Sequence, residues 1–182
     1  VIARGLALLR LLGIALTAAY VAIWWDAFYR DHLGHLAALT ALTGWIVAGV
    51  VVNLRHGVPT WFAVADVVVG VAAGLSAPWI VPAASHGDAS SPAFFAVQLA
   101  SVCSVCALRT RWVLAVLVVL AASLYIPNRE YYPQSVTSTV LLLFVGVAIR
   151  QAVVRLSRVA IAADDWLAAV GERARLETVA AA

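Results

Sequence analysis

The stretch FAVADVVVGVAAG, residues 62–74, contains one carboxylate, Asp66, inside a run of small and branched apolar residues. With its flanking residues it forms an apolar segment from about residue 61 to residue 80, close to the roughly 20 residues that a helix needs to cross a bilayer. A charge at the centre of a membrane costs roughly 2.5 to 3.5 kcal/mol on the insertion scale. We therefore expect Asp66 to have a partner or a function.

The composition of the whole chain points to the same class of protein. Of its 182 residues, 64% are hydrophobic and 12% are charged, and the mean hydropathy is +0.98. A soluble domain of this length needs a largely polar exterior, which so few charges cannot supply. The sequence therefore predicts an all-α membrane protein, with membrane lipid as its main surroundings.

Six apolar segments predict a six-helix transmembrane bundle, with several passes through the cell membrane. They cover about residues 6–28, 36–54, 61–80, 92–108, 112–126 and 136–154. The fifth segment is short for a bilayer, so we expect it to be tilted or locally mismatched. Residues 1–154 are thus expected to form the six-span transmembrane bundle, and residues 155–182 a cytoplasmic helix that extends the last span.

All 12 basic residues are arginines, and most of them flank the predicted spans. Because basic loops stay in the cytoplasm, their distribution favours cytoplasmic amino and carboxyl termini. Only Arg30 and Arg129 fall on the outer side, each beside an acid. Arginines in these places indicate topology, so we expect no nucleic-acid partner.

The segment after the sixth span, VRLSRVAIAADDWLAAVGERARLETVAAA (residues 154–182), keeps a high helix propensity but becomes polar. A heptad pattern places six small or apolar residues on one seam. They are Ala160, Ala163, Leu167, Val170, Ala174 and Ala181. Glu177 interrupts the pattern, so the sequence favours a helix that leaves the membrane over a long coiled coil.

Several of these segments resemble the amino-terminal membrane region of MacS-type sensor histidine kinases of actinobacteria. ARGLALLRLLGIALTAAY (residues 3–20) looks like the first helix of that family, and FAVADVVVGVAAGLS (residues 62–76) is similar to its third. CALRTRWVLAVLVVLAASL (residues 106–124) resembles its arginine-containing turn between two helices. VLLLFVGVAIRQAVVRLSR (residues 140–158) and ERARLETVAAA (residues 172–182) look like its last span and the linker to the phosphoacceptor helix.

The resemblance implies a membrane signal-input module of a two-component system in a bacterial inner membrane. It also implies a homodimer, ATP as the cofactor of a kinase core, and a response regulator as the partner of that core. No histidine follows His86, so we assign no catalytic residue, and no cofactor or metal, to these residues. We expect the kinase core to lie outside these 182 residues.

Asp66 and Arg10 are the candidates for an ion pair inside the membrane. If the third helix enters the membrane near Trp61, Asp66 lies about five residues deeper, roughly 7 to 8 Å at 1.5 Å per residue. Arg10 lies at about the same depth on the first helix. The pair could fix the order of the helices, or it could rearrange to carry a signal. Alternatively, Asp66 could face water, a ligand or another protein.

Other polar or small residues suggest contacts between helices. Gln98, Thr40 and Thr43 could form hydrogen bonds between helices, and Gly70 and Gly74 have the GxxxG spacing that lets helix backbones approach closely.

Four further side chains offer reactive chemistry. His32 and His35 lie three residues apart at the predicted outer mouth, where they could bind a cation or sense pH. Cys103 and Cys106 lie in an apolar segment, where we expect them to be packing residues; redox sensing is the alternative.

Two other functions compete with the signal-input module. An accessory subunit would use its small-residue faces to pack beside another membrane protein. A small transporter would need polar groups along a pathway, broken helices or an internal repeat, and the sequence offers Asp66 and Gln98. A membrane enzyme is disfavoured because no nucleophile and base share a predicted depth.

Overall fold

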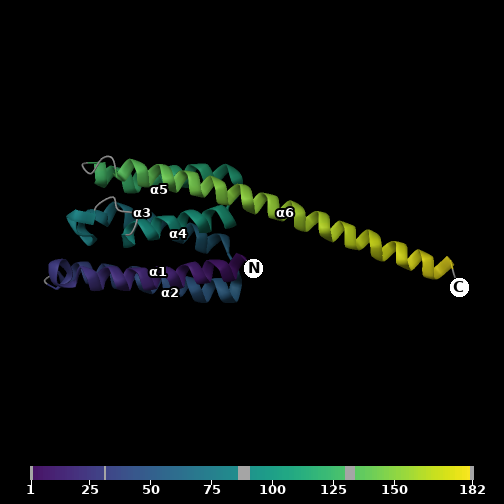
Figure 1. Ribbon diagram of the computed structural model, residues 1–182, viewed down its shortest axis with the longest axis horizontal. Coiled ribbons are helices and arrows are strands. Elements are labelled where there is room, and N and C mark those ends of the chain that lie inside the picture. The colour runs from purple at the N-terminus through teal and green to yellow at the C-terminus, as the bar shows by residue number, and fades with distance from the viewer. Residues whose placement is uncertain (1, 31, 86–90, 130–133, 181–182) are drawn as a thin grey trace. The chain divides into compact units, whose positions relative to one another are not determined.

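The computed structural model of the chain describes residues 2–30, 32–85, 91–129 and 134–180, and these residues form helices joined by short turns, with no strand among them (Figure 1). The predicted all-α class is therefore confirmed. The elements, in chain order, are α1 (Ile2–Ile23), the π-helical turn η1 (Trp25–Tyr29), α2 (Leu33–His56), α3 (Thr60–Ile80), the 3₁₀ turn η2 (Ala83–Ser85), α4 (Pro92–Ala107), α5 (Thr110–Asn128) and α6 (Gln134–Ala180).

Helices α1, α2 and α3 are each long and apolar enough to cross a membrane, and α4 and most of α5 form shorter apolar helices. Their outward faces carry many exposed aliphatic side chains, which water would solvate poorly and lipid solvates well. On α1 to α3 these side chains include Leu8, Leu11, Leu12, Leu16, Val47, Val51, Leu54, Val64, Val68 and Leu75. The chain therefore has the surface of a membrane protein; the number of spans and their orientation stay predictions.

The chain divides into two compact units, residues 1–146 and residues 147–182. The first unit holds α1 to α5 and the first turns of α6. The second is the remainder of α6, and its side chains from Arg155 to Arg173 are exposed. The boundary predicted between residues 154 and 155 concerns the exit from the membrane, and it stays a prediction.

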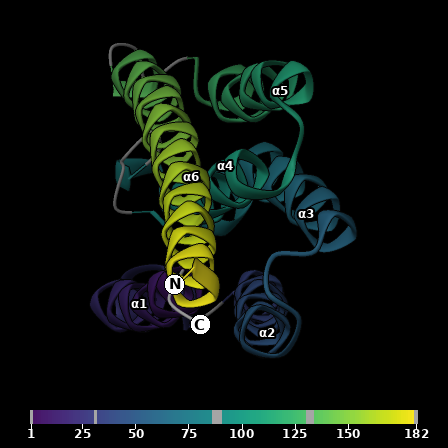
Figure 2. The ribbon, with the colours of Figure 1, turned by 90° about the vertical axis from the view of Figure 1, so that its right-hand side faces the viewer.

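Helix α4 is the central element of the first unit. It contacts α1, α3 and α5, and in the nearly end-on view it lies between α1 and the pair formed by α3 and α5 (Figure 2). Eleven of its 16 residues are buried, as expected for a helix that is apolar around its whole circumference. Pro92 occupies its first turn, and the Ser91 hydroxyl accepts a hydrogen bond from Phe94 N at 3.3 Å, which caps the helix.

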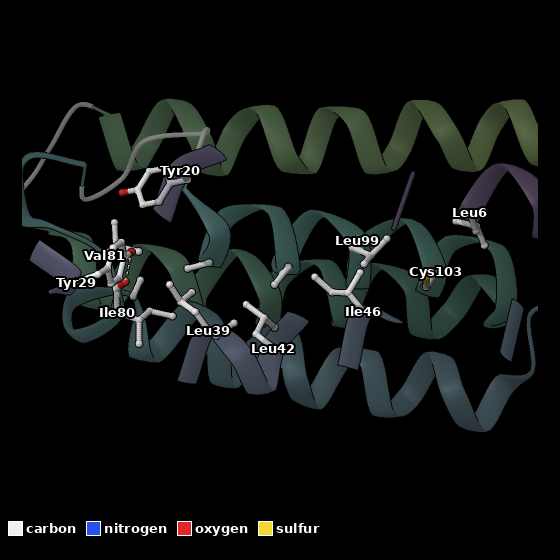
Figure 3. Close-up of a cluster of buried hydrophobic side chains, with 14 residues drawn as sticks. Leu6, Tyr20, Tyr29, Leu39, Leu42, Ile46, Ile80, Val81, Leu99 and Cys103 are labelled. Atoms are coloured by element: carbon white, nitrogen blue, oxygen red, sulfur yellow. Dashed lines mark hydrogen bonds between the residues drawn. The ribbon is translucent and has the colours of Figure 1, made fainter. Parts of the chain in front are cut away.

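Two apolar clusters hold this unit together. The larger lies between α1, α2, α3 and α4 and runs along the helices from Tyr29 and Ile80 to Leu6 and Cys103 (Figure 3). The smaller joins α4 to α5 through Phe94, Val97, Ala100, Leu120, Ala121 and Leu124. Helix α2 packs mainly against α1 and less extensively against α3.

The end of α1 differs from the continuous helix predicted for residues 6–28. The α-helix ends at Ile23, and the wider π-helical turn η1 follows, with Arg30 N donating to Trp25 O at 2.9 Å. In this register Tyr29 is fully buried, and its hydroxyl donates to Ile80 O at 2.9 Å. Apolar periodicity cannot reveal a single wide turn, because the residues remain hydrophobic on both sides of it.

Helix α2 ends at a tight turn into α3. Gly57 has φ 76°, a left-handed conformation that is unfavourable for residues with a Cβ. Pro59 follows as the residue that precedes α3 and cannot continue α2. The turn therefore joins α2 to α3 within three residues, Gly57 to Pro59.

The GxxxG spacing of α3 marks a close contact. A Cβ on Gly70 would lie 2.8 Å from Ala100 Cβ of α4, and a Cβ on Gly74 would overlap the side chain of Ser123 of α5. Both glycines therefore let α3 approach its neighbours more closely than a side chain would permit. This contact explains why α3 packs so extensively against α4 and α5.

Replacement of Gly74 by leucine should lower the free energy of unfolding by about 1–3 kcal/mol, because the new side chain overpacks the contact with α5. The matched control is Gly5→Leu on α1, where nothing lies within 4 Å of an added Cβ. The control should be neutral or slightly stabilising, because leucine favours a helix more than glycine does. Unfolding of both variants in detergent, followed by circular dichroism, makes the comparison; equal stability would refute close packing at Gly74.

Candidate functional site

The structure brings Arg10 of α1 and Asp66 of α3 into contact. Arg10 Nη2 donates to Asp66 Oδ2, and the two side chains are 0% and 3% exposed. The two residues are 56 positions apart in the chain, so their meeting fixes α1 against α3 at one register. An ion pair so well shielded from solvent is the feature that the apolar sequence around Asp66 predicted.

Three further groups surround the Arg10 guanidinium. Nη2 also lies 3.3 Å from Cys103 Sγ of α4. In the amide orientation that gives both polar atoms of Asn53 a partner, Oδ1 accepts from Arg10 Nε at 3.1 Å and Nδ2 donates to Gly57 O at 3.1 Å. The Phe62 ring lies beneath the guanidinium, with its centroid 5.2 Å from Cζ, which adds a cation–π contact.

The second oxygen of Asp66 has its own donor. Trp45 Nε1 of α2 donates to Asp66 Oδ1 at 2.8 Å, and the Trp45 indole stacks on Phe62 with centroids 5.0 Å apart. Both carboxylate oxygens are thus hydrogen-bonded within a low-dielectric interior, where an unpaired charge would be most costly.

Gly49 makes room for this arrangement on α2. A Cβ at that position would overlap the Arg10 guanidinium, so only glycine lets the charged group approach the α2 backbone. We call Arg10, Trp45, Gly49, Asn53, Phe62, Asp66 and Cys103 the Arg10 cluster. It connects α1, α2, α3 and α4.

The charges of the Arg10 cluster balance, since one guanidinium meets one carboxylate. Buried ion pairs contribute little net stability compared with an apolar core, but the loss of one partner is strongly destabilising. Their best supported role is to specify one arrangement of helices over others. The Arg10 cluster therefore suits the predicted role of fixing the order and register of the helices, which stays a prediction. A rearrangement of α1 to α4, the alternative role, would have to exchange its hydrogen bonds.

Comparisons with protein-family models, curated proteins and solved structures found no match for this chain.

The two predicted sensing histidines lie together at the turn from η1 to α2. The imidazoles of His32 and His35 stack with centroids 4.9 Å apart and an interplanar angle of 8°, and both stack on Phe28. His32 Nδ1 lies 2.7 Å from Phe28 O. Phe28 also meets Tyr29 edge to face, and burial raises the pKa of the Tyr29 phenol, so its hydroxyl remains a donor.

Among the described residues the histidine pair belongs to no group of three or more histidine, cysteine or acidic side chains that could hold a metal ion. Shortly before the histidines in the chain, Arg30 Nη1 lies 3.5 Å from Asp26 Oδ1, and both side chains are exposed to solvent.

The other predicted polar contacts differ in outcome. Thr40 and Thr43 donate to Leu36 O and Leu39 O of their own helix, each at 2.8 Å, so they do not join α2 to a neighbour. Gln98 is half-buried on α4, and its side chain forms no hydrogen bond with another described residue. Cys103 is buried and contacts Arg10, which gives this cysteine a place in the Arg10 cluster that its apolar surroundings did not predict.

Sequence reasoning missed Asn53 and Trp45 as partners of the ion pair. Asn53 is 1% exposed, and an amide so near the end of an apolar segment is a usable signal, because a buried amide needs partners. Trp45 lies well inside the predicted second span, away from the interface where tryptophan is usually placed. Such an interior indole requires an acceptor for its N–H.

Removal of either charged partner should destabilise the fold by about 3–5 kcal/mol, because the other charge stays buried without its counterpart. We expect this for Arg10→Leu and for Asp66→Leu. The double variant should lose much less than the sum of the two single losses, because no charge remains. The control is Arg4→Leu. Arg4 is an exposed arginine on the same helix, so this substitution should change the free energy of unfolding by less than about 0.5 kcal/mol. Strict additivity in a double-mutant cycle, measured by unfolding in detergent, would mean that the contact carries no coupling.

Proposed function

We propose that this chain is the membrane signal-input module of a two-component sensor histidine kinase in a bacterial inner membrane. It would act as a homodimer and pass a stimulus through α6 to a kinase core, which would use ATP and transfer phosphate to a response regulator. Six membrane spans with cytoplasmic termini would surround the Arg10 cluster. The support comes from the sequence resemblance and from α6.

The length and composition of α6 are the main structural support for the proposal. The helix has 47 residues, more than twice the roughly 20 that cross a bilayer, and no proline interrupts it. Its first part is apolar, and its later part carries Arg155, Arg158, Asp164 and Asp165, which belong in water. A single helix with this change of composition suits a rigid connection from membrane to cytoplasm.

The exposed surface of residues 147–173 suggests what α6 would meet. Leu156, Ala160, Ala163, Leu167 and Val170 follow the spacing of one helical seam and are all exposed in the single chain. A second copy of α6 would cover this seam in a parallel dimer. The same seam would suit the accessory-subunit alternative, in which a different membrane protein covers it. The small-transporter alternative does not require such a seam.

The size of the natural gene product separates these alternatives. We expect the protein purified from its native membrane to be much heavier than 19.2 kDa, to yield a histidine-bearing peptide beyond Ala182, and to label with radioactive ATP. Intact mass, peptide mapping and autophosphorylation measure the three properties. A product near 19.2 kDa that takes up no phosphate would overturn the kinase proposal, and the proteins that co-purify with it would then test the accessory-subunit alternative.

Transmission through α6 should depend on helical phase. Insertion of one alanine after Ala162 rotates the following part of the helix by about 100° about the helix axis. Insertion of seven alanines rotates it by only about 20°. We expect one-, two- and three-residue insertions to change autophosphorylation of the full-length protein several-fold, and the seven-residue insertion to return it near the parent level. Equal activity in the whole series would show that α6 is a passive tether.

A further inference from the structure

A groove opens between α1 and α2 and extends from Ile14 and Val47, next to the Arg10 cluster, towards η1. Its volume is about 890 Å³, within the range of small-molecule sites. Its walls are mostly aliphatic and small side chains, and Trp25 and Asp26 of η1 line one end. Ala18, Ala22, Thr40 and Gly44 are among its other lining residues.

The groove is hollow because its walls are made of small residues. Ala18 and Ala22 of α1 and Gly44 of α2 all line it, and a Cβ added to Gly44 would meet nothing within 4 Å. Thr40 and Thr43 also line the groove, but their hydroxyl hydrogens are donated to carbonyls of their own helix. Thr17 is a third hydroxyl in the lining, and the lining residues apart from the threonines and Asp26 are apolar, which suits a hydrocarbon chain.

Opposite charges lie at and beside the η1 end of the groove. Asp26 lines it, and Asp26 Oδ1 lies 3.5 Å from Arg30 Nη1. The two side chains are 84% and 69% exposed, so the pair is solvated and contributes little stability. Trp25, beside Asp26, is an exposed indole that can bind an ammonium group through its ring face.

We propose that this groove binds a membrane lipid whose headgroup carries an ammonium and a phosphate. One acyl chain lies between α1 and α2, the ammonium binds Asp26 and Trp25, and the phosphate binds Arg30. Zwitterionic charge complements the Asp26–Arg30 pair, because each lipid charge meets a protein charge of opposite sign. An anionic lipid would satisfy Arg30 but place an uncompensated negative charge beside Asp26.

The occupant comes from the bilayer, because α1 and α2 are both long and apolar enough to cross it and the groove opens between them. This inference uses the membrane location of the two helices and does not depend on the kinase proposal. Its test measures lipid binding directly, so failure of the lipid site and failure of the kinase assignment are separate results.

Native mass spectrometry provides the test. The purified chain is equilibrated in nanodiscs that contain equal amounts of phosphatidylethanolamine and phosphatidylglycerol with the same palmitoyl and oleoyl chains, and is then released into mild detergent. We expect one phosphatidylethanolamine per chain to be retained, with at least tenfold less phosphatidylglycerol. Equal retention of the two lipids, or a preference for phosphatidylglycerol, would overturn the proposal.

Variants locate the site. Gly44→Phe fills the groove and should reduce retained phosphatidylethanolamine at least tenfold, whereas Gly5→Phe, which occupies equally open space away from the groove, should leave it unchanged. Asp26→Asn and Arg30→Gln should each reduce the preference for phosphatidylethanolamine several-fold. If Gly44→Phe does not fold, as judged by gel filtration and helix content, Ala18→Phe on the opposite wall replaces it. Unchanged retention in a folded groove variant would refute the site.

Discussion

One buried guanidinium constrains the helical bundle. Arg10 lies in an apolar interior where its charge must be balanced, and the chain supplies a carboxylate, an amide and a thiol from three other helices. Each of these contacts requires a particular rotation and height of its helix, because hydrogen bonds weaken steeply with misalignment. Apolar packing alone tolerates many arrangements of similar helices, and the Arg10 cluster selects one of them.

Close contacts between helix backbones add a second constraint to that of the ion pair. Gly49 lets the guanidinium reach α2, whereas Gly70 and Gly74 let α3 settle against α4 and α5. In lipid there is no hydrophobic force between helices, so shape and hydrogen bonding decide which faces meet. Small residues therefore specify the neighbours of α3, while Arg10 and Asp66 specify its register.

Hydropathy was sufficient to predict the helices of this chain, because an uninterrupted apolar segment in a membrane has few structural choices. The Arg10–Asp66 contact could also be predicted from the sequence, because opposite charges at the same depth in a membrane stabilise each other. The sequence could not reveal the wide turn at η1, whose hydrogen bonds shift by one residue without any change of hydrophobicity. Nor did it reveal Asn53 and Trp45 as partners of the pair, because an amide or an indole in an apolar run has no obvious partner until the helix rotations are known.

The two ends of α2 differ in their surroundings. Towards the Gly57 turn, Trp45, Gly49 and Asn53 bind α2 into the Arg10 cluster. Towards η1, the groove on the α1 side and a cavity of about 440 Å³ on the α3 side flank the helix, while Leu39 and Leu42 stay buried in the larger apolar cluster. Trp45 belongs to both regions, since it lines the cavity and donates to Asp66. A displacement of the η1 end of α2 would therefore act on Asp66 through the Trp45–Asp66 hydrogen bond, because α2 offers no other side-chain hydrogen bond to Asp66 among the described residues.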